Sequence, residues 1–273
     1  MTQLGSAVVL ITGATGGFGT ELTRQLLRKG SQLILSDRPG TSVESWAATL
    51  QQSMGGVSGK VLTCIEADLS TQEGCNVLYG ATQTMEQAID VLVNNAGIAL
   101  LGTMVETPAE QWEQLMNINL MTPMRLSTYF ATDMVKRRQG HIVNISSLAG
   151  WVAIPGLTAY AASKYGLRGF SEGLRHEVFP YNVKVTTVYP FFSRTPILQA
   201  PRLGSFAEAD PQLPAALTTD PARIMARTIR AIERNQAELF PDAVAQVGHF
   251  SKRYLPALTR WVSRRLDTRN KNV

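Results

Sequence analysis

The fold of this chain is decided by a glycine-rich stretch, TGATGGFG at residues 12–19. A short β-branched run, residues 7–12, precedes it, and a helical pattern follows from about residue 18 to residue 29. Glycines let a backbone turn tightly and approach a pyrophosphate closely, and a helix N-terminus offers free N–H groups to that anion. The spacing is Gly-x-x-x-Gly-x-Gly, whereas the commoner dinucleotide fingerprint is Gly-x-Gly-x-x-Gly. The stretch predicts a dinucleotide-binding strand–turn–helix unit, with a glycine turn that holds no ligand as the alternative.

Outward from this unit, strand patterns and helix patterns alternate along the chain. Parallel strands that are buried on both faces read as short, continuous apolar runs, and the segments that fit are residues 7–12, 32–36, 60–66, 89–93, 141–146, 184–189 and 238–240. Helical patterns lie between them, the longest over residues 159–178. Such alternation implies right-handed βαβ units. We predict an α/β fold: a Rossmann-type doubly wound parallel sheet of about seven strands, with helices on both faces and ligands at the carboxyl ends of the strands.

Three helix starts are predicted from the residues that open them. Ser70 and Glu73 have the spacing of a capping box. Pro108 follows Thr107 at a position typical of the first residue of a helix. The pair Asp220-Pro221 opens a helix that we expect to run to about residue 234.

Length and composition are typical of one globular domain that spans residues 1–273. The chain has 273 residues, of which 44% are hydrophobic and 17% charged. Its two cysteines, Cys64 and Cys75, predict free thiols in a reducing cytoplasm. The first residues lack the basic start of a secretory leader, and no long apolar stretch predicts a spanning helix. No metal site is expected, because the histidines are scattered without ligand spacing: His141, His176 and His249.

One segment departs from this composition. Residues 190–216 contain five prolines, at positions 190, 196, 201, 211 and 214. A loop of this length inside a compact domain is typically a lid or a binding loop. We therefore expect a substrate lid at residues 191–217, with a poorly ordered connection as the alternative.

The positive charge of the chain is concentrated at its C-terminal end. The net charge is +5, yet residues 250–273 carry seven basic residues and one acid, so the remainder is close to neutral. A general nucleic-acid surface is therefore excluded. Apolar residues recur at helical spacing in this basic tail. Such a helix packs on its own domain or on a second subunit, which we favour, or lies on an anionic membrane as a peripheral contact.

Asp37 closes the second predicted strand and is the residue that points to a particular dinucleotide. A carboxylate at this position accepts hydrogen bonds from the adenosine ribose and repels a 2′-phosphate, which favours NAD. Arg38 is adjacent and would instead pair with that phosphate, so NADP stays open as the alternative.

Tyr160 and Lys164 are four residues apart in the longest helical pattern and therefore share one face of it. An ammonium near a phenol favours the phenolate and lowers the pKa of the tyrosine. We expect Tyr160 to act as a general acid/base. The spacing alone also fits an ordinary surface pair.

Combined with Ser147, Asn119 and the Asn94-Asn95-Ala96-Gly97 segment, these motifs resemble the short-chain dehydrogenase/reductase family, in its compact single-domain branch. The resemblance runs from about residue 7 to residue 195. It implies a catalytic set formed by Asn119, Ser147, Tyr160 and Lys164. It further implies that the cofactor contacts Gly13, Thr15, Gly17, Phe18, Gly19, Asp37, Arg38, Asp68, Leu69, Asn95, Ala96, Gly97, Tyr160, Lys164, Pro190 and Thr195.

The resemblance assigns a role to each catalytic residue. Tyr160 exchanges a proton with the substrate oxygen, and Ser147 hydrogen-bonds that oxygen. Lys164 holds the nicotinamide ribose and lowers the pKa of Tyr160, and Asn119 holds a water that links Lys164 to solvent. The chain departs from the family after the sixth strand, where Pro190-Phe191 replaces the usual Pro-Gly, and the role of Thr195 at the carboxamide is less firmly implied.

The expected substrate is a largely apolar secondary alcohol or ketone. The segment between Ser147 and Tyr160 carries no charge, and residues 98–101 are apolar. If these segments line the pocket, the ligand shares their character; the alternative is that they pack in the core. The residues expected to contact substrate are Ser147, Ala149, Trp151, Phe191 and Phe192.

The sequence thus predicts an NAD-preferring alcohol dehydrogenase or carbonyl reductase. Two alternatives are a noncatalytic NAD(H)-binding sensor or scaffold and an epimerase or dehydratase that recycles its cofactor. In the resembled family, the helix that carries the catalytic tyrosine commonly forms subunit contacts, so we expect a homodimer or homotetramer.

Overall fold

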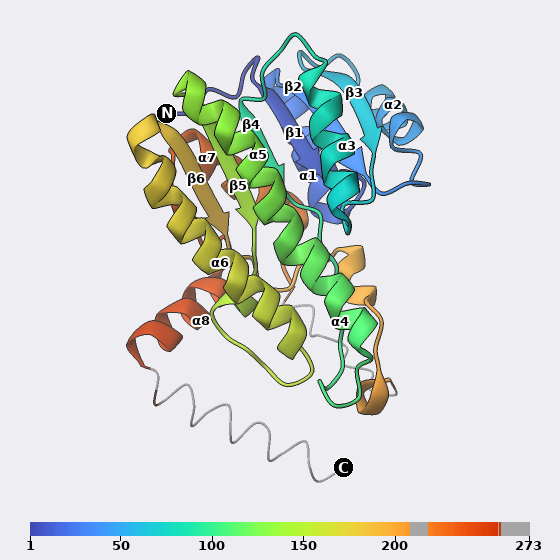
Figure 1. The fold of residues 1–273 in the computed structure, drawn as a ribbon, viewed down its shortest axis with the longest axis vertical. Coiled ribbons are helices and arrows are strands. Elements are labelled where there is room, and N and C mark those ends of the chain that lie inside the picture. The colour runs from blue at the N-terminus through green and yellow to red at the C-terminus, as the bar shows by residue number, and fades with distance from the viewer. Residues whose placement is uncertain (208–217, 256, 258–273) are drawn as a thin grey trace.

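Seven parallel strands form a single sheet in a computed structural model that describes residues 1–207, 218–255 and 257. Their order in the sheet is β3-β2-β1-β4-β5-β6-β7, so the chain winds outward from β1 in one direction and from β4 in the other. The predicted doubly wound sheet is confirmed (Figure 1). The strands are β1 (Val8–Thr12), β2 (Gln32–Asp37), β3 (Lys60–Glu66), β4 (Val91–Asn94), β5 (Gly140–Ile145), β6 (Val183–Val188) and β7 (Glu238–Leu239).

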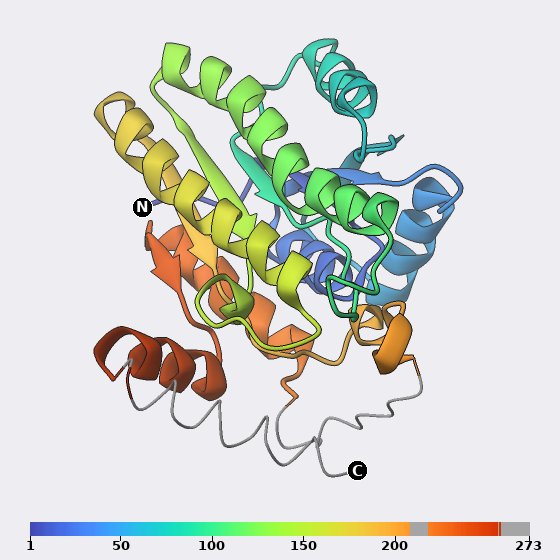
Figure 2. The same ribbon diagram turned by 60° about the horizontal axis from the view of Figure 1, so that its bottom comes forward.

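Helices cover both faces of the sheet (Figures 1 and 2). One face packs against α1 (Gly17–Lys29), α2 (Val43–Met54) and α7 (Pro221–Glu233). The other packs against α3 (Gln72–Gln83), α5 (Thr122–Arg137) and α6 (Thr158–Val178), and α4 (Ala109–Met116) leads into α5. The last described helix is α8 (Ala243–Tyr254).

The apolar runs of the strands fill two cores, one on each side of the sheet. Within β1, Val9 and Ile11 belong to the core under α1, while Val8 and Leu10 belong to the core under α5. This alternation follows from the two-residue period of a strand. Because both faces are covered, every residue of β1 is buried, which is why these strands read as continuous apolar runs.

Two predicted helix starts are wrong in detail. Thr71, not Ser70, is the N-cap of α3, since its side chain accepts a hydrogen bond from the Gly74 N–H at 3.0 Å. The Ser70 hydroxyl donates instead to the Asp68 carboxylate at 2.6 Å. Pro108 is the N-cap of α4 rather than its first residue. Asp220 caps α7 as predicted, through a bond from the Ala222 N–H at 2.9 Å.

Several predictions concern segments that the structure covers only in part. Of the expected lid, residues 208–217 lie outside the described residues, as do residue 256 and residues 258–273 of the basic tail. None of the helices in the described part of the chain is long and apolar enough to cross a membrane. Cys64 and Cys75 are both free thiols.

His141 is a buried histidine that ties the chain start to β6. Its Nδ1 lies 2.9 Å from the Thr2 hydroxyl, and its Nε2 lies 2.8 Å from the Thr186 hydroxyl. Burial lowers the pKa of His141 to about 3, and the charge of Lys184 acts in the same direction. The folded protein therefore holds this ring neutral throughout the neutral range.

We predict that His141 makes the fold sensitive to mild acid. An unfolded chain binds a proton at this ring below about pH 6.5, whereas the folded protein does so only near its lowered pKa, so stability falls as the pH falls. The expected loss from this one group is about 2 kcal/mol between pH 7 and pH 5. Urea unfolding of the wild type and of His141→Gln measures it. The exposed His176→Gln variant is the control; an equal slope in all three proteins would contradict the prediction.

Candidate active site

The loops after β1 and β4 are locked together at the carboxyl edge of the sheet. The Thr12 hydroxyl accepts hydrogen bonds from the N–H groups of Asn95 and Ala96, both at 3.0 Å. The Asn95 side-chain amide donates in return to the carbonyls of Thr12 and Gly13, both at 2.9 Å. Asn95 and Ala96 thus hold the glycine turn in place. Gly13 adopts a φ of +65° beside the Ala96 backbone, where a side chain would be strained.

Two further glycines of the turn are needed for close approach. A Cβ at Gly19 would lie 2.1 Å from the Gly13 carbonyl oxygen, so the first turn of α1 packs directly on the loop. A Cβ at Gly17 would lie 2.5 Å from the Cγ2 atom of Thr195. Thr195 therefore lies over the start of α1. It is far from the glycine turn in the sequence but in contact with it in the structure.

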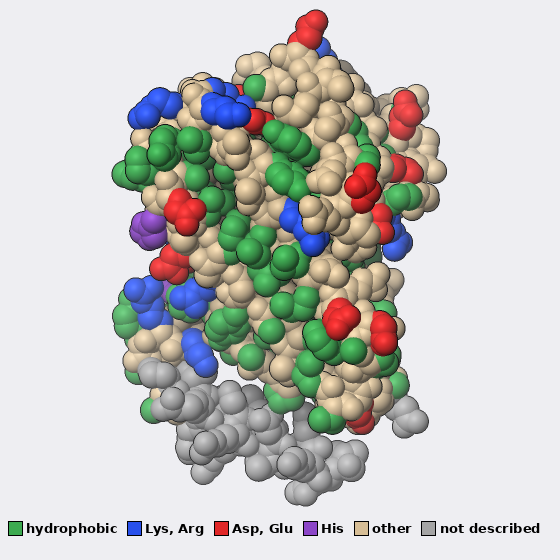
Figure 3. Space-filling view, viewed as in Figure 1, with side chains coloured by type: hydrophobic (Ala, Val, Ile, Leu, Met, Phe, Trp, Pro, Cys, Tyr) green, Lys and Arg blue, Asp and Glu red, His purple; other side chains and the backbone are tan. Residues whose placement is uncertain are grey.

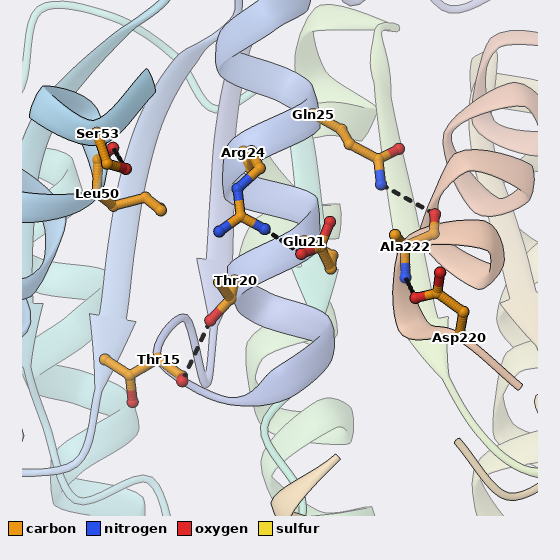
Figure 4. A network of polar contacts seen from close by, with 9 residues as sticks. All are labelled: Thr15, Thr20, Glu21, Arg24, Gln25, Leu50, Ser53, Asp220 and Ala222. Atoms are coloured by element: carbon orange, nitrogen blue, oxygen red, sulfur yellow. Dashed lines mark hydrogen bonds and ion pairs between the residues drawn. The ribbon is translucent and has the colours of Figure 1, made fainter. Parts of the chain in front are cut away.

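The start of α1 is fixed to its surroundings by polar contacts (Figure 4). The Thr20 hydroxyl donates to the Thr15 carbonyl at 3.3 Å. One turn further on, the Gln25 amide donates to the Ala222 carbonyl at 3.0 Å, which joins α1 to the start of α7. These bonds fix the position of α1, whose N-terminal N–H groups can bind an anion.

Asp37 lies beside the glycine turn, as its place at the end of the second strand predicts. Its Oδ2 accepts hydrogen bonds from the Thr15 N–H at 2.8 Å and from the Thr15 hydroxyl at 2.7 Å, and its Oδ1 accepts from the Arg38 N–H at 2.8 Å. Arg38 itself is exposed. Asp68 is also exposed. Leu69 is buried in the core, and its backbone carbonyl accepts a bond from Thr122.

Asn119 lies fully buried in a π-helical segment, η1 (Asn117–Met121), between α4 and α5. Its Oδ1 accepts from the Ile98 N–H, and its Nδ2 donates to the Ile98 carbonyl, both at 2.9 Å. Such bulges occur frequently at functional sites. A Cβ at Gly97 would lie 3.1 Å from Asn119 Oδ1 and 3.7 Å from Lys164 Nζ. The Asn119 amide and the Lys164 ammonium therefore both lie close to the backbone of Gly97.

Lys164 is 5% exposed, and its ammonium donates to the Ile145 carbonyl at the end of β5 at 3.0 Å. Burial disfavours the charged form, which lowers the pKa of Lys164 to about 8. Its Nζ lies 5.6 Å from the centroid of the Tyr160 ring. The predicted Tyr–Lys face is confirmed.

Ser147 completes this group. Its hydroxyl oxygen accepts a bond from the Ala149 N–H at 3.1 Å and lies 3.5 Å from the Pro190 carbonyl. Its hydroxyl lies close to the phenol of Tyr160. Burial raises the pKa of Tyr160, and the neighbouring Ser147 hydroxyl acts against that rise. The lowered tyrosine pKa expected from the Tyr–Lys spacing is therefore wrong in direction here, because desolvation of the phenolate outweighs the favourable contacts.

The residues expected at the substrate differ in where they lie. Ala149 and the edge-to-face pair Phe191–Phe192, whose ring centroids are 4.7 Å apart, are half-buried beside Ser147. Trp151 is instead 7% exposed within an aromatic cluster formed with Tyr189, Phe240 and His249. The Arg168 guanidinium covers its ring at 3.2 Å. The structure thus gives Trp151 a packing position rather than a place in the pocket wall.

Asp242 is a residue near the site that sequence reasoning missed. One carboxylate oxygen accepts from the Ala245 N–H at 2.8 Å and caps α8, and the other accepts from the Phe191 N–H at 2.9 Å. A Cβ at Gly248 in α8 would lie 2.8 Å from a methyl carbon of Leu148, the neighbour of Ser147. Through these contacts α8 supports both the β6 loop and the Ser147 loop. An acid just before an apolar helical run was the available signal.

Comparison with known proteins shows the family to which the chain belongs. The family model for short chain dehydrogenase matches residues 7–204, and the chain belongs to this family. It is 35% identical over 194 residues to bovine (Bos taurus) dehydrogenase/reductase SDR family member 7B, covering 70% of this chain and 59% of the relative. It is 32% identical over 232 residues to an acetoacetyl-CoA reductase of an Acinetobacter strain, covering 84% of this chain and 92% of the relative. The chain thus spans about three fifths of the first of these relatives.

Solved structures agree with the fold. A short-chain dehydrogenase from Sphingobium yanoikuyae in complex with NADPH superposes with a TM-score of 0.74 at 26% identity, over 98% of this chain and 96% of that one. The residues here fit such a dinucleotide. The N-cap of α1 makes no side-chain hydrogen bond, so the first N–H groups of this helix are available to a pyrophosphate, and the Asp37 carboxylate lies beside the glycine turn.

We predict that Asp242 contributes more to stability than an ordinary helix cap. Asp242→Ala removes a cap and leaves the Phe191 N–H without its acceptor, so the free energy of unfolding should fall by about 2–3 kcal/mol. Asp220→Ala removes only the cap of α7 and should cost about 1 kcal/mol. Urea titrations of both variants test this. Equal losses would contradict a bracing role for Asp242.

Proposed function

We propose that the chain is an NAD-preferring alcohol dehydrogenase or carbonyl reductase that acts on a largely apolar secondary alcohol or ketone. The observation that carries the proposal is the buried Lys164 ammonium, which lies 5.6 Å from the centroid of the Tyr160 ring, with the Ser147 hydroxyl close to that tyrosine. Two neighbouring hydroxyls with a cation beside one of them are suited to hold a substrate oxygen and move one proton to or from it.

The proton chemistry follows from these positions. When bound, the nicotinamide cofactor supplies or accepts the hydride. In the reducing direction, Ser147 and Tyr160 hold the carbonyl oxygen. As the carbonyl carbon gains hydrogen, the C=O electron pair moves onto the oxygen, which takes the phenolic proton of Tyr160. The Lys164 ammonium then stabilises the tyrosinate, which burial alone disfavours.

The preference for NAD rests on Asp37. Its carboxylate already accepts two hydrogen bonds from Thr15, which anchors a negative charge beside the glycine turn. A 2′-phosphate at that place would be repelled, whereas ribose hydroxyls can donate to the remaining lone pairs.

The apolar character of the substrate is supported by the loops around Ser147. The segment after β6 is tied to the loop after β4, since the Leu101 N–H donates to the Pro201 carbonyl at 3.0 Å and the Leu203 N–H donates to the Leu101 carbonyl at 2.8 Å. A Cβ at Gly156 would lie 2.7 Å from the Phe206 ring and 3.1 Å from Leu101. The side chains of Leu101, Phe206, Phe191 and Phe192 thus bring apolar surface to these loops, which favours an apolar ligand if the loops line the pocket.

A measurement of net cofactor consumption distinguishes two other functions from this one. A noncatalytic NAD(H) sensor would bind the cofactor without consuming it, and it has no use for the proton-transfer group at Tyr160. A cofactor-recycling epimerase or dehydratase would change its substrate with no net change in NADH. A cytoplasmic location and a homodimer or homotetramer stay predictions, to be tested by fractionation and by sedimentation of the purified chain.

We predict that Tyr160→Phe lowers kcat by at least about 100-fold, because the substrate oxygen loses its proton donor. Binding of NADH should stay within a few-fold, since the ring is kept. Initial rates and NADH fluorescence titration measure both effects. Tyr181→Phe, which lies outside the site, is the matched control. Retention of normal kcat in Tyr160→Phe would refute the assigned acid/base.

We predict that Asp37→Ala raises the Kd for NADH by about tenfold and leaves the Kd for NADPH unchanged or lower. The reason is loss of the ribose acceptor together with loss of repulsion at the 2′ position. Thr15→Val keeps the carboxylate and removes one of its donors, so it should keep the preference for NADH. Parallel fluorescence titrations with the two cofactors decide the matter. An unaltered NADH affinity in Asp37→Ala would show that this carboxylate does not select the cofactor.

A further inference from the structure

The inner face of helix α8 packs against the rest of the domain. Ala245 is completely buried, and Gly248 lies against Leu148. The His249 ring stacks on Phe240, with 4.0 Å between centroids and an interplanar angle of 15°. These contacts fix which side of the helix faces solvent.

The outer face of α8 is apolar and aromatic. Val247 is 65% exposed, Phe250 56% and Tyr254 60%. They are spaced three and four residues apart and therefore share one side of the helix. The rings of Phe250 and Tyr254 contact each other, with 4.9 Å between centroids. Exposed residues of this kind are ordinary when scattered, but a row of them along one helix face marks an interaction surface.

Positive charge is concentrated at the C-terminal end of α8. Lys252 and Arg253 lie in the last turn, and the helix contains no Asp or Glu. Arg253 borders the apolar face, whereas Lys252 lies on the side of Ala245 and Gly248. The Arg253 guanidinium lies 5.7 Å from the centroid of the Tyr254 ring. The sequence continues the trend, since residues 250–273 carry seven basic residues and one acid. Figure 3 shows Lys and Arg side chains gathered at the end of the molecule where α8 lies.

We propose that the outer face of α8, formed by Val247, Phe250 and Tyr254 with Arg253 at its edge, docks on an anionic phospholipid bilayer. Aromatic and aliphatic side chains next to cations are the composition of helices that lie in a bilayer interface, and anionic headgroups supply the complementary charge. An isologous contact between two copies would instead place this positive surface against itself.

The docked orientation has a consequence for the active site. α8 lies at the end of the molecule toward which the strands run (Figures 1 and 2). The same helix contacts Leu148, next to Ser147, and its cap Asp242 holds Phe191. A chain docked through α8 would therefore present the Ser147 end of the sheet to the membrane surface.

The test is co-sedimentation of the full chain with vesicles. One set contains phosphatidylcholine and phosphatidylserine at 70:30, and the other contains phosphatidylcholine alone. At 50 mM NaCl the partition coefficient should be at least tenfold higher on the anionic set, and it should fall at least tenfold at 500 mM NaCl because the charges are then screened. No measurement of activity is involved, so the result is independent of the proposed function.

Two variants locate the surface. The double variant F250S/Y254S and the charge reversal R253E should each lower the partition coefficient on anionic vesicles at least tenfold. Phe179→Ser is the matched control, because Phe179 is an aromatic residue that is 70% exposed away from α8, and it should bind as the wild type does. Circular dichroism melting checks that the variants remain folded.

Four results would overturn the proposal. They are no binding to the anionic set at low salt, equal binding to both vesicle sets, binding unchanged in both α8 variants, and equal loss in Phe179→Ser. Sedimentation velocity adds a fifth. If F250S/Y254S lowers the oligomeric state of the lipid-free chain, this face is a contact between copies and the lipid assignment fails.

Discussion

The arrangement of the site depends on one buried cation. Lys164 is almost fully enclosed, and burying an ammonium is costly unless its donors find acceptors. The Ile145 carbonyl at the end of β5 supplies one acceptor, and Asn119 lies nearby across Gly97. The need for this acceptor fixes the position of Lys164, and with it α6, relative to the end of β5. Tyr160, one turn earlier on the same helix, thereby lies beside Ser147. The π-helical bulge at Asn119 is the backbone adjustment that accompanies this packing.

The rest of the edge is rigid for a second reason. The glycine turn, Asn95 and Thr195 contact one another so closely that a side chain at Gly13, Gly17 or Gly19 would displace them. On the opposite side of the site, Asp242 and Gly248 of α8 hold the loops that carry Phe191 and Ser147. The family model matches residues 7–204, so this support from α8 lies outside the matched part of the chain.

The sheet and the catalytic group could be predicted because their signals are strong. Parallel strands covered on both faces leave continuous apolar runs, and the glycine turn and the Tyr160–Lys164 spacing are rigid requirements. Helix caps were less certain, since Ser70 and Thr71 are both competent caps and the Asp68 carboxylate decides between them by binding Ser70. The spacing of residues in the sequence did not predict which side chains of the site are buried. Burial places Trp151 in an aromatic cluster, and it reverses the expected direction of the Tyr160 pKa shift.

In the proposed function, this site moves a hydride between a nicotinamide and a carbonyl carbon while Tyr160 moves the proton. The most direct measurement mixes the chain with a panel of apolar ketones and NADH or NADPH deuterated at C4, using both epimers, and analyses the alcohols by mass spectrometry. We expect one deuterium on the carbinol carbon from one epimer, with matching loss of the reduced cofactor. Binding of the cofactor without any transfer of deuterium across the panel, or conversion of a ketone to unlabelled product, would contradict it.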